Sequence, residues 1–140
     1  MDSDQSYTDS RRGAIHNREY ATQVKDYTGL RFGNITPTDI DGLIEYKDKA
    51  YVYIELKYKD AELPRGQRLA LERQCDDMQR VKPTITIIAS HSETGDIDVA
   101  NTTVTEYRFW GAWRTRDTTT TTYDLISKFF SWVETGSDLK

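Results

Sequence analysis

A glutamate and a lysine separated by one residue, Glu55-Leu56-Lys57, form the pattern in this 140-residue sequence that is best suited to chemistry. They lie in an alternating run, residues 50–58, that is typical of a β-strand. Glu55 and Lys57 project from the same face, because strand side chains alternate with period two. A lysine beside a carboxylate can hold an attacking water or stabilise developing negative charge. The plainer interpretation is a weak ion pair on a solvated face.

Two aspartates upstream could complete a metal site. Asp39 and Asp41 lie on one side of a second strand-like run, residues 38–47, which a short polar connection joins to the first as a hairpin. Asp41 and Glu55 could then share a cation across adjacent strands, and the backbone carbonyl of Leu56 could add a ligand. Oxygen ligands favour Mg²⁺ or Mn²⁺. Both aspartates could instead be turn residues, and Asp41 is the stronger candidate.

Five further segments show regular periodicity. Apolar residues recur at helical spacing in residues 15–27, 66–80 and 123–133, and β-branched or aromatic residues fill 84–89 and 104–113. The order helix, strand, strand, helix, strand, strand, helix predicts an α/β fold. Its mixed central β-sheet is expected to be flanked by helices.

Length and composition fit one such domain. Residues 1–13 are polar without periodicity, so we expect a flexible N-terminal arm followed by a domain over residues 14–140. Hydrophobic residues make up 36% of the chain, and no run approaches the roughly 18 to 20 apolar residues of a membrane span. The first 12 residues resemble no secretory signal. The sequence therefore predicts a cytoplasmic protein without a membrane segment.

Cysteine and histidine are too scarce for a zinc site. Cys75 is the only cysteine, and His16 and His91 are the only histidines. The net charge of −4 argues against a protein that coats nucleic acid through bulk electrostatics. It does not exclude a nuclease, because metal-holding carboxylates contribute negative charge that bound cations would reverse locally.

Two helical residues extend the candidate site. Gln67 begins an otherwise apolar stripe in the second helix, and we expect it to emerge where that helix meets the sheet edge. Glu19 lies beside the apolar stripe of the first helix, at the edge of its buried face. The plainer interpretations are a glutamine that begins its helix and a solvated glutamate.

These motifs together resemble the PD-(D/E)XK nuclease superfamily, in particular its small phage and RecB-like branches. The resemblance rests on the Asp-x-Asp-Gly of residues 39–42, the Glu-Leu-Lys of residues 55–57 and the Gly-Gln helix start at residues 66–67. It covers roughly residues 19–80. No proline directly precedes the aspartate, and the chain carries no appended DNA-binding module.

The resemblance implies a single-domain restriction-endonuclease-like fold and a Mg²⁺- or Mn²⁺-dependent endonuclease, acting on DNA rather than RNA. Asp41 and Glu55 would bind metal, Lys57 would position or activate water, and Gln67 would orient the site. Glu19 would match the acidic residue that some members supply from the first helix. We also expect a phage or prophage setting.

A second function stays open at this point. The chain could be a catalytically silent protein of the nuclease fold that binds a protein partner or a nucleotide, such as a phage inhibitor of host defence. Convergence of Asp41, Glu55 and Lys57 in an open cleft would favour the nuclease, and a scattered set would favour the binder.

Two groups of residues could contact a partner molecule. Arg65, Arg68, Arg73 and Lys59 could touch phosphates, but acidic neighbours favour a solvated helix face. The aromatic C-terminal third, which includes Trp110, could stack on bases or form a homodimer interface, although core packing explains most of it.

Overall fold

The computed structural model describes residues 24–116 and 119–136. The chain divides into two compact units, residues 1–37 and 38–140. In the described part of the first unit, the backbones of Phe32 and Ile35 pair across a tight turn. Gly33 in that turn has a φ of 66°, a conformation that glycine adopts without steric cost.

The predicted first helix is wrong in the part that the structure describes. Residues 24–27 are not helical, and Val24, which the helical stripe would bury, is 91% exposed. Asp26 Oδ1 accepts the Thr28 N–H at 3.0 Å, a local bond that competes with helix formation. The rest of that helix, with Glu19, and the predicted arm of residues 1–13 lie outside the described residues. The boundaries of arm and domain therefore stay a prediction.

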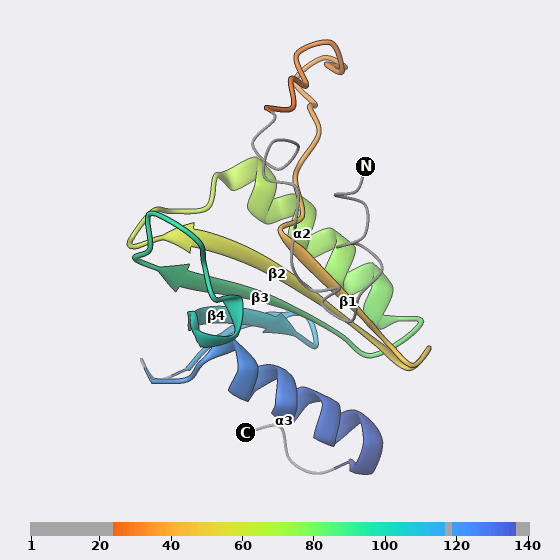
Figure 1. The fold of residues 1–140 in the computed structure, drawn as a ribbon. Coiled ribbons are helices and arrows are strands. Elements are labelled where there is room, and N and C mark those ends of the chain that lie inside the picture. The colour runs from red at the N-terminus through yellow and green to blue at the C-terminus, as the bar shows by residue number, and fades with distance from the viewer. Residues whose placement is uncertain (1–23, 117–118, 137–140) are drawn as a thin grey trace, which may run out of the picture. The chain divides into compact units, whose positions relative to one another are not determined.

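A five-stranded mixed sheet forms the second unit (Figure 1). Its strands lie side by side in chain order, and only β2 and β3 run parallel. The strands are β1 (Gly42–Tyr46), β2 (Ala50–Tyr58), β3 (Thr84–His91), β4 (Thr103–Phe109) and β5 (Ala112–Thr115). The helices are α2 (Arg65–Gln79), the short 3₁₀ helix η2 (Val99–Asn101) and α3 (Thr122–Thr135). The predicted α/β fold with a mixed sheet flanked by helices is confirmed.

Two strand predictions need correction. The first strand begins at Gly42 instead of residue 38, so Asp39 and Asp41 precede it. The run 104–113 is a hairpin of two strands, because the chain reverses at Trp110 and Gly111, with φ values of 53° and 73°. Glycine favours such a turn, but a tryptophan there is unusual.

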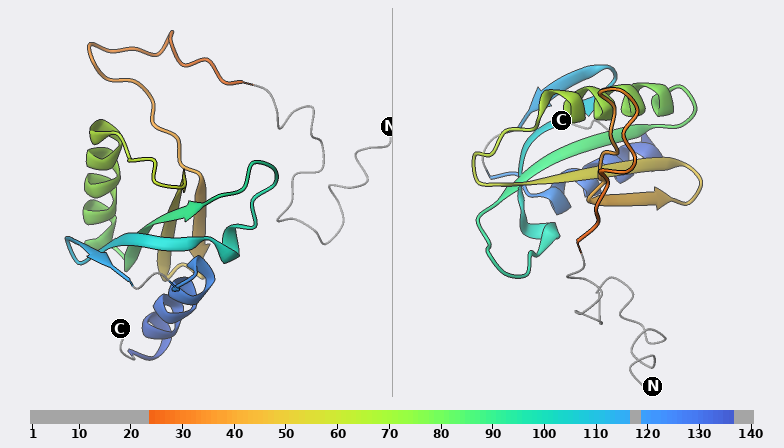
Figure 2. Two further views of the ribbon diagram at one scale, coloured as in Figure 1. Left: turned by 90° about the vertical axis from the view of Figure 1, so that its left-hand side faces the viewer. Right: turned by 90° about the horizontal axis from the view of Figure 1, so that it is seen from above.

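One face of the sheet packs against α3 and forms the hydrophobic core (Figure 2). Alternate residues of β2 and β3, such as Val52 and Ile87, are fully buried there, together with Phe129 of α3. Thr121 caps the start of α3 by accepting the Asp124 N–H at 3.1 Å. No helix in the described ranges is long and apolar enough to cross a membrane.

The opposite face, which α2 covers, is largely polar. Leu71 and Cys75 of α2 are buried against it, as their helical stripe predicts, but they lie outside the main hydrophobic cluster. Charged side chains fill much of the remaining contact between α2 and the sheet. This polar layer holds most of the candidate site.

Candidate active site

Asp41 meets β2 at the point where β1 no longer covers it. Gly42 pairs with Ile54, so the last residues of β2 extend beyond the start of β1. The Leu56 N–H therefore has no partner from a β1 strand residue, and Asp41 Oδ2 accepts it at 2.8 Å. The N–H and C=O of one strand residue face the same neighbouring strand, so the Leu56 carbonyl also faces the side of Asp41.

Glu55 is the most buried acidic side chain in the described ranges, with only 5% of its surface exposed. Its Oε2 accepts a hydrogen bond from Gln67 Nε2 at 3.0 Å and lies 3.6 Å from Lys57 Nζ. Its Oε1 is buried and has no hydrogen-bond partner among the residues that the structure describes. A buried carboxylate oxygen without a partner is costly, so this atom marks a place where a cation or donor would be stabilising.

Electrostatics at Glu55 support the same conclusion. Burial raises the pKa of Glu55 above its ordinary value, and the negative charge of Asp41 raises it further. Lys57 and Gln67 lower the pKa of Glu55 but do not offset the burial. A cation near Glu55 would remove the repulsion that Asp41 exerts on the Glu55 charge, which is the situation that a metal site requires.

Gln67 reaches Glu55 from the first turn of α2. The helix begins after Pro64, whose side chain cannot cap it, and the stripe that contains Leu71 and Cys75 faces the sheet. Gln67 lies one turn before Leu71 on that stripe, so its amide meets the end of β2. The hydrogen bond fixes the orientation of the Glu55 carboxylate.

Lys57 faces an open pocket of about 850 Å³ between the end of β2 and the start of α2. We call it the basic pocket, because four cationic side chains line it, from Lys57, Lys59, Arg65 and Arg68, against three carboxylates, from Asp60, Glu62 and Glu106. Lys57 lines the pocket, whereas Asp41 and Glu55 are not among its lining residues; Glu55 lies beside Lys57, and Asp41 is near enough to raise the pKa of Glu55. The pocket is large enough for a phosphate group and part of a nucleotide.

Arg68 is not a solvated residue of an exposed helix face. It forms two hydrogen bonds with Glu106 of β4, at 2.9 and 2.7 Å, and its guanidinium lies 4.3 Å from the Trp113 ring centroid. Arg65 and Arg73, in contrast, are exposed. Glu106 was not among the residues predicted from the sequence, although its alternation with Arg108 in β4 places both on the α2 face.

The other predicted metal ligands do not lie beside Asp41 and Glu55. Asp39 is exposed and precedes the strand by three residues, and Glu19 lies outside the described residues. Within residues 24–116 and 119–136, no group of three or more histidine, cysteine, aspartate or glutamate side chains is arranged to hold a metal ion. The candidate set is therefore two carboxylates, from Asp41 and Glu55, and the Leu56 carbonyl.

Comparisons with known proteins return no relatives. The chain matches no protein-family model, and it has no match among curated proteins or among solved structures. The resemblance to PD-(D/E)XK nucleases therefore stays a prediction that rests on the residues themselves. The geometry brings Asp41, Glu55, Lys57 and Gln67 together.

Proposed function

We propose that this protein is a metal-dependent nuclease that hydrolyses phosphodiester bonds, in DNA rather than RNA, with Mg²⁺ or Mn²⁺. The observation that carries the proposal is the buried Glu55 Oε1, which has no hydrogen-bond partner within the described ranges and lies near a second carboxylate and a lysine. An ordinary surface ion pair would not need a buried, partly unsatisfied glutamate.

The residues present fit a divalent cation. Asp41, Glu55 and the Leu56 carbonyl would hold it, and when bound it would polarise the phosphate and lower the pKa of a bound water. Lys57 would donate to a phosphate oxygen as negative charge develops in the transition state, because its Nζ lies at the pocket wall. Gln67 would keep the Glu55 carboxylate in position through its hydrogen bond.

A second function has a specific observation in its favour. Asp41 already accepts the Leu56 N–H, and the described residues contain no cluster of three or more acidic, histidine or cysteine side chains that could hold a metal. These facts suit a catalytically silent protein of this fold that binds a protein partner or a nucleotide. Trp110, which is 59% exposed, offers such a protein a contact residue, also for a homodimer.

The first prediction separates the two functions. Closed circular plasmid, linearised plasmid and linear single-stranded DNA are incubated with the protein and Mg²⁺ or Mn²⁺, and cleavage is followed on gels. We expect cleavage that EDTA abolishes and that Lys57→Ala slows by about 100-fold or more, the size of effect seen when one transition-state donor is removed. Lys128→Ala is the matched control, because Lys128 is exposed on α3 and lines no part of the basic pocket.

Thermal unfolding of both variants is measured in parallel, so that loss of activity through unfolding is recognised. Cleavage that persists in Lys57→Ala would remove Lys57 from the proposed role. Absence of cleavage in every folded sample would favour the binding protein.

A further inference from the structure

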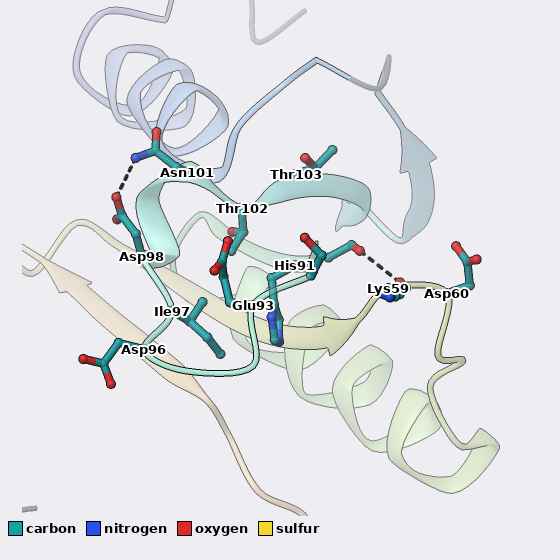
Figure 3. A pocket seen from close by; sticks show the side chains of 12 residues that line it. Lys59, Asp60, His91, Glu93, Asp96, Ile97, Asp98, Asn101, Thr102 and Thr103 are labelled. Carbon is teal, nitrogen blue, oxygen red and sulfur yellow. Dashed lines mark hydrogen bonds between the residues drawn. The ribbon is translucent and has the colours of Figure 1, made fainter.

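A second pocket of about 680 Å³ adjoins the basic pocket at the carboxyl ends of β2 and β3 (Figure 3). The two pockets share a wall made of Lys59, Asp60 and Ser90. Lys57 pairs with Ser90 across β2 and β3, so the shared wall begins directly beside the proposed catalytic lysine.

The two pockets differ in charge. The basic pocket has four cationic side chains, among them Lys57 and Arg65, against three carboxylates, of which Glu106 is paired with Arg68. It also receives the start of α2, which has no side-chain cap and no acidic residue in its first turn. An uncapped helix start with cations around it is electropositive and would attract phosphate.

The second pocket is acidic. Among the residues that the structure describes, four carboxylates line it, from Asp60, Glu93, Asp96 and Asp98, against one lysine, Lys59; Asp60 and Lys59 belong to the shared wall. Asp98 is held by a hydrogen bond from Asn101 Nδ2 at 2.6 Å, as Figure 3 shows. This acidic pocket would repel a nucleic-acid backbone, because its charges lie within about one Debye length of any phosphate that enters it.

The wall between the pockets is firmly fixed. Lys59 has a φ of 50°, an uncommon conformation for a lysine that persists only where the surroundings impose it. Its N–H donates to the His91 carbonyl at 2.7 Å, and its own carbonyl accepts from Ser90 Oγ at 2.9 Å. The change from basic to acidic lining therefore occurs at a defined position in the fold.

We infer that the site acts on the ends of nucleic-acid chains. The inference rests on the proposed nuclease function. The backbone enters through the basic pocket, reaches Lys57 and Glu55, and stops at Lys59, because a continuing strand would pass its phosphates over the acidic pocket. A chain that ends at the site avoids this repulsion, whereas a chain without ends does not.

The test compares two substrates of one sequence. One is a linear duplex with free ends, and the other is the same duplex with both ends closed by hairpin loops. Both are incubated with the intact protein and Mg²⁺ or Mn²⁺. We expect the open duplex to be cleaved at least about tenfold faster, within the range that charged surfaces impose on association.

A charge-neutralised variant tests the cause. Glu93→Gln combined with Asp96→Asn should raise cleavage of the closed duplex and bring the two rates together. The matched control combines Asp77→Asn with Asp124→Asn, which changes the net charge equally at exposed positions that line neither pocket. The control should keep the ratio of the intact protein.

The outcomes separate the two proposals. Equal cleavage of open and closed duplexes, or a ratio that the double variant leaves unchanged, would overturn the end preference and leave the nuclease in place. Cleavage of neither substrate, with the intact protein folded, would overturn the nuclease and the end preference together.

Discussion

The two faces of the sheet are built from the same strands but have opposite character. The face under α3 is apolar, and its central residues, such as Ile87 and Phe129, are fully buried. The face under α2 holds the buried Glu55 and two arginine–carboxylate pairs, Arg68 with Glu106 and Arg108 with Asp76.

The two faces therefore have different roles: the apolar face contributes stability, and the polar face holds the candidate site. Apolar burial contributes a large favourable free energy without requiring exact partners, whereas each polar group on the α2 face needs a partner to offset its desolvation. Arg108 has such a partner in Asp76, but no described residue is a hydrogen-bond partner of Glu55 Oε1. Glu55 Oε1 therefore lies on the face where burial of polar groups has the larger desolvation cost. A functional group is expected on such a face.

The largest effect is expected on the apolar face. Phe129→Ala removes a fully buried ring that contacts Phe109 and Trp132. We expect the free energy of unfolding to fall by about 3 to 5 kcal/mol, because the cavity cannot be refilled. Chemical denaturation measures this change, and a loss below about 1 kcal/mol would show that the apolar face is not the main source of stability.

A smaller effect is expected on the polar face. Asp76→Ala removes the partner of Arg108, whose Nη2 lies 2.8 Å from Asp76 Oδ2 and whose side chain is only 13% exposed. The free energy of unfolding should fall by about 1 to 3 kcal/mol, since a half-buried guanidinium loses its charged acceptor. A double-mutant cycle with Arg108→Ala isolates the pair, and a coupling near zero would contradict the role given to it.

The smallest effects concern pH and have opposite signs at two glutamates. Lys49 and Tyr46 lower the pKa of Glu134, on α3, to about 2. Its stabilising contribution is present above pH 4.5 and is lost as the pH falls from 4.5 towards 2. Burial and Asp41 raise the pKa of Glu55, so its charge destabilises the fold at neutral pH, and acidification towards 4.5 relieves that penalty.

The free energy of unfolding of the metal-free protein is measured by chemical denaturation between about pH 3 and about pH 8, in steps on the order of a few tenths of a pH unit. The contributions of Glu134 and Glu55 are distinguished because they change with pH in opposite directions. Glu134→Gln should flatten the acidic part of the profile, whereas Glu55→Gln should flatten the part above pH 4.5. If Glu55→Gln left that upper part unchanged, the burial of a charged Glu55 would not matter for stability.

Local periodicity was sufficient to predict most of the second unit. The alternation in residues 50–58 placed Glu55 and Lys57 on one face, and the stripe from Gln67 to Cys75 oriented α2. Both patterns succeed because a strand or a helix fixes side-chain directions through its own repeat.

Other features depend on contacts between distant segments, which periodicity does not contain. The acidic neighbours of Arg68 in the sequence predicted a solvated side chain. In the structure, Arg68 instead donates a hydrogen bond to Glu106 of β4 and lies against the sheet. The reversal at Trp110 was missed because its φ of 53° is atypical for that residue. Residues 24–27 are not helical, because the Asp26 side chain accepts the Thr28 N–H and so competes with the predicted helical pattern.

Because β2 extends beyond the start of β1, Asp41 can reach β2, and the candidate site is assembled from residues that lie close together in the sequence. Asp41, Glu55, Lys57 and Gln67 come from one contiguous stretch, residues 41–67, so the entropy lost in bringing them together is small. Insertions or deletions after α2 would leave the spacing of these four residues unchanged.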